Sequence, residues 1–140
     1  MIDSFTKLIN LLETNPMNTA VIVMFKSPTC PPCKQTIAYL TSIGNTGEII
    51  WYRNQKNFER EHGFKIHFMP IDVYAMNIEN NEKLLPIVSA SQTIRGFPTF
   101  DFFVIKNGKL ERIEKVRHAG GLGPGAFETY LDTCSHYVHR

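Results

Sequence analysis

The sequence predicts an α/β fold, with a mixed central sheet of four to five strands that is flanked by helices on both faces. The first observation is the run at residues 20–25, which is apolar at every position, as expected for a central strand buried between helices. The second is the helical spacing of apolar residues before and after this run. The third is Asn107-Gly108 between two strand-like runs, which predicts a hairpin and therefore an antiparallel pair. A chain of 140 residues is long enough for one domain, and we expect residues 1–140 to form one.

Composition and charge exclude several classes of protein. The hydrophobic fraction of 43% and the charged fraction of 20% are ordinary for a globular protein. The net charge is only +2 and no basic block occurs, so we expect no nucleic-acid partner. The longest apolar run is far shorter than the roughly 20 residues that span a bilayer, and no signal peptide is evident, so we expect no membrane partner. Three cysteines are an odd number, which argues against a disulfide-stapled secreted scaffold and favours a cytoplasmic location.

In the first half of the chain, the sequence pattern clearly indicates a helix and a strand, but it is less informative for the segment at residues 44–64. Asp3 or Ser4 can cap a first helix, which ends before Pro16 because the residue before a proline avoids helical geometry. The central strand follows at residues 20–25. Residues 44–64 form an extra segment after the cysteine-containing helix described below, and within it we expect a turn or helix only at residues 57–62.

The second half predicts strands and helices in alternation. Residues 65–73 show the pattern of a strand, and residues 79–90 that of a helix in which a proline implies a kink or a late start. A strand at residues 100–105 is joined by the hairpin to a returning strand at residues 110–116. Pro124 opens a last helix. The apolar face of that helix consists of Phe127, Tyr130, Leu131, Cys134 and Val138.

The most informative stretch is residues 27–34, where Cys30 and Cys33 have C-x-x-C spacing between the central strand and a helix. If Cys30 is the N-cap, Pro31 falls at the first helical position, which proline favours because its missing N–H would be unpaired there anyway. Cys33 keeps the helical spacing of the apolar residues that follow, so we expect Cys30 to be exposed at the helix tip and Cys33 to be shielded beneath it. This asymmetry suits disulfide exchange, in which Cys30 attacks and Cys33 resolves the mixed disulfide.

The residues around the pair influence how readily Cys30 ionises. A helix N-terminus stabilises an anion, and a thiolate is an anion. Pro31 and Pro32 have no N–H to donate, so only the N–H of Cys33, and at most that of Lys34, remains in range. The Lys34 ammonium adds a positive charge. We therefore expect Cys30 to be the more acidic thiol, without an extreme shift.

In their order along the chain, these features resemble the thioredoxin family. The resemblance rests on Phe25 followed by C-P-P-C-K at residues 30–34, on I-R-G-F-P-T at residues 94–99, on the K-N-G hairpin at residues 106–108 and on Gly120. It extends from residue 20 to the end of the chain, and the motifs are specific in combination. It implies a thioredoxin-like fold and a thiol–disulfide oxidoreductase that acts on protein disulfide substrates without a cofactor, together with an unidentified electron donor or acceptor.

The resemblance also implies how a substrate is bound. Pro98 would follow a cis peptide bond beside the cysteine pair, and such bonds are rare enough to indicate a required backbone shape. The backbone of Phe97, between Gly96 and Pro98, would pair with an extended substrate segment. The proline would also keep metal ions away from the cysteines, so we expect no metal site.

The sequence departs from typical thioredoxins at several positions. Thr29 stands where they carry tryptophan before the first cysteine, and Met24 stands where they carry a buried aspartate on the strand. The lysine of their following strand falls near Phe68. The interval from Cys33 to Pro98 is longer than usual, mostly because of residues 44–64. These departures leave thiol chemistry as the expectation, but not the role of a general thioredoxin.

Two alternatives remain for the cysteines. One is a non-catalytic thioredoxin-like interaction module with two unreactive cysteines and residues 44–64 as its partner surface. The other is a zinc site. Its ligands would be Cys30, Cys33, Cys134 and either His136 or His139. The apolar position of Cys134 on its helix favours simple burial over metal binding.

Five further residues carry weaker interpretations. Asp101 is a distant candidate for a base that deprotonates Cys33, although a surface strand residue is the favoured interpretation. Trp51 and Tyr52 are expected to belong to the core rather than to a partner surface. Gly120 and Gly121 resemble the glycine pair with which glutaredoxins hold glutathione, but a glycine near this position is also common in thioredoxins.

Overall fold

The computed structural model describes residues 1–76 and 81–138, and it has the mixed α/β architecture that the sequence predicts. The helices and strands, in chain order, are α1 (Phe5–Glu13), β1 (Thr19–Lys26), α2 (Pro31–Thr41), α3 (Ile50–His62), β2 (Lys65–Asp72), α4 (Leu85–Ser91), β3 (Thr99–Lys106), β4 (Lys109–Arg112), β5 (His118–Ala119) and α5 (Ala126–Ser135). Short 3-10 helices occur at Val73–Ala75 (η1), Glu82–Leu84 (η2) and Glu114–Val116 (η3). Among the helices so described, none is long and apolar enough to cross a membrane.

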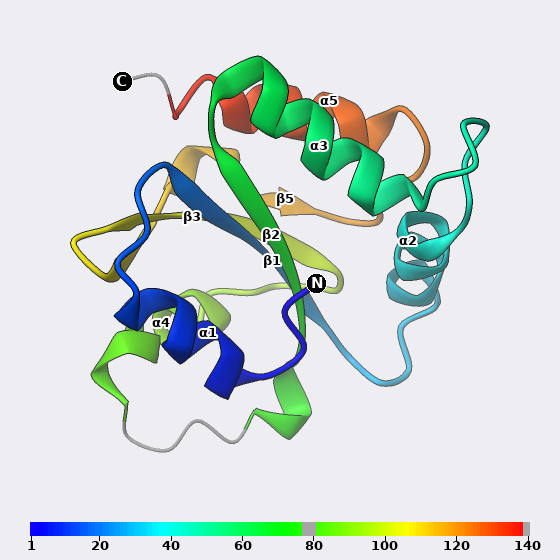
Figure 1. Ribbon diagram of the computed structural model, residues 1–140. Helices are drawn as coiled ribbons and strands as arrows, with labels where there is room; N and C mark the ends of the chain where they lie inside the picture. The colour runs from blue at the N-terminus through cyan, green and yellow to red at the C-terminus, as the bar shows by residue number, and fades with distance from the viewer. Residues whose placement is uncertain (77–80, 139–140) are drawn as a thin grey trace.

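The five-stranded sheet has the order β2-β1-β3-β4, and β5 also pairs with β3. β1 and β2 are parallel, whereas the other pairs are antiparallel. At the end of β1, Lys26 lies opposite Asp72 of β2, and Phe25 lies opposite Thr99 of β3. The segments that follow β1 and β2 and the segment that precedes β3 therefore meet at one end of the sheet, next to α2 (Figure 1).

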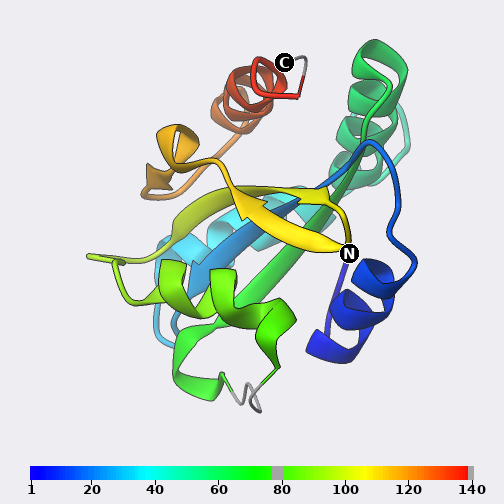
Figure 2. The same ribbon diagram turned by 90° about the vertical axis from the view of Figure 1, so that its left-hand side faces the viewer.

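Helices cover both faces of the sheet (Figure 2). The fully buried strand β1 explains why, since its alternate side chains enter two separate cores. Ala20, Ile22 and Met24 point to the core that includes α2, α3 and α5. The intervening side chains point to the core that includes α1 and α4.

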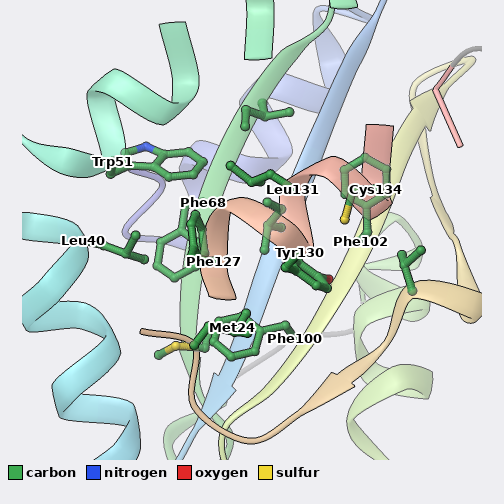
Figure 3. Packing of buried hydrophobic residues seen from close by; sticks show 14 of the residues in the cluster. Met24, Leu40, Trp51, Phe68, Phe100, Phe102, Phe127, Tyr130, Leu131 and Cys134 are labelled. Atoms are coloured by element: carbon green, nitrogen blue, oxygen red, sulfur yellow. The ribbon is translucent and has the colours of Figure 1, made fainter. Parts of the chain in front are cut away.

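Trp51 of α3 is fully buried in the first core, where it lies beside Phe68 (Figure 3), and this confirms its predicted burial. Its ring centroid lies 5.5 Å from that of Phe68 and 6.1 Å from that of Phe127. The prediction is wrong for Tyr52, whose side chain is exposed because it lies on the opposite side of α3.

α3 begins at Ile50, well before the predicted start at residue 57. The prediction missed these first turns because the buried side of α3 has few apolar residues. It consists of Trp51, Asn54 and Phe58, and the Asn54 amide can be buried because it donates to the Ile50 carbonyl at 3.1 Å. The helix ends at His62, the last residue of the predicted range, and Gly63 caps it with a φ of 66° and its N–H bonded to the Glu59 carbonyl.

One other boundary agrees with the prediction, and two differ from it. α4 starts late, which is one of the two predicted effects of its proline, with Pro86 in its first turn; residues 79 and 80 of the predicted helix lie outside the described residues. β4 ends at Arg112, because the chain leaves the sheet through η3 before it returns as β5. α5 begins at Ala126, after the Gly125 N-cap, and the predicted Val138 lies beyond its end.

Candidate active site

The two cysteines lie at the start of α2, as the sequence predicts. Cys30 is the N-cap, and Pro31 and Pro32 occupy the first helical turn. The backbone N–H of Cys33 donates to Cys30 Sγ at 3.2 Å. The N–H of Lys34 donates instead to the Cys30 carbonyl, also at 3.2 Å, so it does not serve the sulfur. Of the two donors considered from the sequence, Cys33 therefore supplies the one that a thiolate at Cys30 would use.

Cys30 and Cys33 are joined by a disulfide, with their Cα atoms 5.3 Å apart. The pair is therefore oxidised, with two electrons fewer than the dithiol form. Cys134 is a free thiol. The C-x-x-C pair thus has the geometry needed to pass between dithiol and disulfide.

The predicted contrast in exposure between the two cysteines is largely wrong. Cys30 is 6% exposed and Cys33 is 1% exposed, so both are buried and only the order of exposure agrees. The reason is local, because the Cys30 side chain turns back over the helix start to accept the Cys33 N–H and to bond to Cys33 Sγ. The neighbouring Pro31, Pro32 and Lys34 are exposed and surround the site on the side of α2.

Beneath the pair, the core is apolar where thioredoxins carry an acid. Met24 is fully buried in the same core as Cys30 and Cys33 and lies opposite Phe100 in the sheet. Its thioether cannot take a proton from Cys33 at neutral pH. Deprotonation of Cys33 therefore has to use solvent or another group.

Asp101 is not a surface residue, so the favoured interpretation from sequence is wrong. Its side chain is 0% exposed, and both oxygens are bound by Arg117, through Nε at 2.9 Å and Nη2 at 2.6 Å. Arg112 adds a contact through Nε at 3.3 Å. Since side chains alternate along a strand, Asp101 points away from the face on which its neighbour Phe100 enters the core that contains the cysteines. The carboxylate stabilises the fold and does not reach Cys33.

Pro98 follows a cis peptide bond from Phe97, which confirms the expected backbone shape. Pro98 itself is buried, Phe97 is half-buried and Gly96 is exposed. The Gly96 carbonyl accepts a hydrogen bond from the Thr99 hydroxyl at 2.7 Å, which holds this segment at the entrance to β3. Because Thr99 lies opposite Phe25 in the sheet, the cis proline lies beside the end of β1 from which the cysteine segment departs.

A loop at residues 120–122 connects the cis proline to α2. The Gly120 N–H donates to the Pro98 carbonyl at 2.8 Å. The Leu122 N–H donates to Thr36 Oγ1 at 3.2 Å. Gly121 lies against α2, where an added Cβ would be 3.4 Å from the Cβ of Pro32, an ordinary van der Waals contact. The Gly120-Gly121 pair thus has a packing role, which sequence reading missed because it depends on contacts with residues far away in the chain.

The described residues do not support the zinc alternative. No group of three or more His, Cys, Asp and Glu side chains among them could hold a metal ion. Cys134 lies inside the core near Phe102 and Tyr130 (Figure 3), and burial raises the pKa of its thiol to about 12. His136 is exposed, and His139 lies outside the described residues.

A disulfide at the start of a helix, a cis proline beside it and a sheet with this strand order define the thioredoxin fold. The fold is similar to that of a thioredoxin from Thermus thermophilus, with 18% identity, a TM-score of 0.57 and coverage of 93% of this chain and 82% of that one. It is also similar to a thioredoxin from Trichomonas vaginalis, with 13% identity, a TM-score of 0.55 and coverage of 98% and 96%. For the germline-specific thioredoxin Deadhead of Drosophila melanogaster, the identity is 18%, the TM-score is 0.52 and the coverage is 98% of each chain. The sequence matches no protein-family model and no curated protein.

Proposed function

We propose that this protein is a thiol–disulfide oxidoreductase that exchanges dithiol and disulfide with protein substrates through Cys30 and Cys33. The observation that carries the proposal is the Cys30–Cys33 disulfide at the N-terminus of α2, with the Cys33 N–H directed at Cys30 Sγ. A pair of inert core cysteines would not require a sulfur at a helix start, where a negative charge is stabilised.

In the reducing direction, the Cys30 thiolate attacks one sulfur of a substrate disulfide. The substrate S–S bond breaks, a mixed disulfide forms between Cys30 and the substrate, and one substrate thiolate leaves. Cys33, after losing its proton, attacks Cys30 Sγ and releases the second substrate thiolate. The substrate gains two electrons and two protons, and the protein loses them as it returns to the disulfide form seen here. A dithiol reductant restores the pair, and the oxidising direction follows the same steps in reverse.

We assign substrate docking to the segment that contains Gly96, Phe97 and Pro98. Gly96 is exposed, and Phe97 directly precedes the buried proline at the entrance to β3. The Pro98 carbonyl already accepts the Gly120 N–H, which leaves the backbone of Phe97 to pair with an extended substrate segment by strand addition. We assign Pro31, Pro32 and Lys34 a supporting role, because the prolines stiffen the start of α2 and Lys34 places a positive charge in its first turn.

We further propose that the protein works in the cytoplasm. The support is the Cys134 thiol, which stays reduced and buried, and an odd number of cysteines. The direction of exchange depends on the reduction potential of the Cys30–Cys33 pair, which equilibration with reduced and oxidised glutathione measures.

The experiment that tests the function is the reduction of insulin by dithiothreitol. The wild type should accelerate it, and Cys30→Ser should lose this acceleration entirely, because no mixed disulfide can form at Cys30. Cys134→Ala is the matched control and should keep the activity, since this buried thiol is not part of the disulfide. A wild-type protein that does not accelerate the reaction would instead support the non-catalytic interaction module.

A further inference from the structure

Tyr74 is an exposed aromatic residue that the proposed function does not yet use. It lies in η1, immediately after β2, and 75% of it is exposed, compared with 48% for Tyr52 of α3. A single exposed apolar side chain is common on protein surfaces and has no meaning alone. What distinguishes Tyr74 is its position and its neighbour.

Tyr74 lies at the same end of the sheet as the cysteine pair. Asp72, two residues earlier, lies opposite Lys26 at the end of β1, and the cysteine segment follows directly from Lys26. The Asp72 carboxylate accepts the Tyr74 N–H at 3.0 Å and is the N-cap of η1. This cap holds the backbone of Tyr74 at the end of the sheet that carries the disulfide.

The neighbour of Tyr74 is Phe97, the residue before the cis proline. The two ring centroids are 6.0 Å apart and the ring planes are inclined by 52°, a tilted arrangement of the kind that aromatic pairs prefer. Phe97 in turn packs against the core that contains Cys30 and Cys33. Tyr74 thus extends the aromatic surface from the buried site out to solvent. A tyrosine suits this position, because its ring can contact an apolar group while its hydroxyl stays in water.

We propose that Tyr74 and Phe97 together bind a bulky apolar side chain, aromatic or aliphatic, that lies within two positions of the reactive cysteine of a protein substrate. The inference rests on the proposed oxidoreductase function and adds a preference to it. A substrate segment paired with the Phe97 backbone presents its side chains alternately to the two sides. Those two positions from the attacked cysteine share its side of the segment and lie against the rings, whereas a small disulfide has no side chain to place there.

The test compares two peptides that are each closed by one disulfide and differ only in the residue two positions after the first cysteine, phenylalanine in one and serine in the other. Their rates with the protein are divided by their rates with dithiothreitol alone, so that differences in intrinsic reactivity cancel. Hydroxyethyl disulfide serves as the small substrate. An aromatic contact of this kind should raise kcat/KM for the phenylalanine peptide about five-fold over the serine peptide.

Tyr74→Ala should remove most of this preference and leave the serine peptide and hydroxyethyl disulfide unaffected, whereas Tyr74→Phe should keep it. Tyr52→Ala is the matched control, since it also removes an exposed tyrosine, and it should keep the preference in full. A wild type that reduces all three substrates without preference, or a preference unchanged in Tyr74→Ala, overturns the inference and leaves the oxidoreductase function standing. A wild type that reduces none of the three overturns both.

Discussion

The backbone N–H of Gly120 donates a hydrogen bond of 2.8 Å to the carbonyl of Pro98. This bond joins the cis proline to the loop that packs on the first turns of α2, where Pro32 and Thr36 lie. The segment proposed to dock the substrate and the helix that carries the disulfide are therefore held together by one short loop. The geometry of the site depends on the conformation of that loop.

Gly120 should tolerate a side chain less well than its neighbour Gly121. Gly120 has a φ of 107°, which a residue with a Cβ adopts only under strain, so Gly120→Ala should lower the free energy of unfolding by about 1–3 kcal/mol. Gly121→Ala places its Cβ at an ordinary contact distance from Pro32, and its effect should stay within about 0.5 kcal/mol. Urea denaturation of both variants measures the difference. Equal losses would show that the backbone of Gly120 is not constrained as described.

Cys30 should react faster than Cys33 with iodoacetamide in the reduced protein. In Cys33→Ser, the thiolate of Cys30 keeps the backbone N–H at residue 33 and the helix N-terminus. In Cys30→Ser, the thiol of Cys33 is 1% exposed above the apolar Met24. These differences predict a ratio of roughly ten-fold or more between the alkylation rates.

Cys134 is present in both of these variants and serves as an internal reference. Because burial raises the pKa of its thiol to about 12, it should take up no label until the protein unfolds. Mass spectrometry of proteolytic fragments identifies the labelled residue. A Cys33 that reacts faster than Cys30 would reverse the proposed roles of attacking and resolving thiol.

Arg117 should be more important for stability than Arg112, although both contact Asp101. Arg117→Met leaves a fully buried carboxylate without its two-point partner and should cost about 3–5 kcal/mol. Arg117 also donates hydrogen bonds to the carbonyls of Ala90 and Thr93, and the substitution removes these bonds as well. Arg112→Met removes a contact of 3.3 Å and should cost about 1 kcal/mol.

The Arg117 effect can be separated from simple loss of packing. Asp101→Asn in the Arg117→Met background removes the unpaired buried charge of the carboxylate. The double variant should therefore recover part of the lost stability in a urea titration. If the double variant were no more stable than Arg117→Met, the cost would not come from the buried carboxylate.

His67 should make the protein less stable as the pH falls. Burial, followed by the positive charges of the N-terminal amine and of Lys65, lowers the pKa of His67 below its usual value of 6.5. The unfolded chain therefore binds a proton at a higher pH than the folded protein does. The free energy of unfolding falls as the pH drops through 6.5, and this loss levels off below the lowered pKa of the folded state.

The measurement is the free energy of unfolding at a series of pH values between about 7 and 5. His67→Gln should show a flatter dependence than the wild type over this range. His136→Gln, at an exposed histidine, is the control for the substitution itself. A His67→Gln curve parallel to that of the wild type would mean that His67 titrates alike in the folded and unfolded states.

The sequence by itself determined the features that depend on neighbours along the chain. Cys30 as N-cap with Pro31 in the first turn follows from the backbone chemistry of proline, and the turn at Asn107 and Gly108 follows from their tolerance of positive φ. The apolar run of β1 predicted a buried central strand, because nothing but helices on both faces could cover it. These local signals were enough to place the cysteine pair and to predict the fold.

Only the tertiary structure decided the features that depend on residues far apart in the chain. Asp101 can be buried because it forms an ion pair with Arg117, which lies beyond the hairpin in the chain. α3 begins earlier than predicted because Trp51 packs against Phe68 and Phe127 in the core. The link from Pro98 through residues 120–122 to α2 and the ring contact between Tyr74 and Phe97 belong to the same class. Each is a contact between segments that are far apart in the chain, and the pattern within one segment does not show which other segment it will contact.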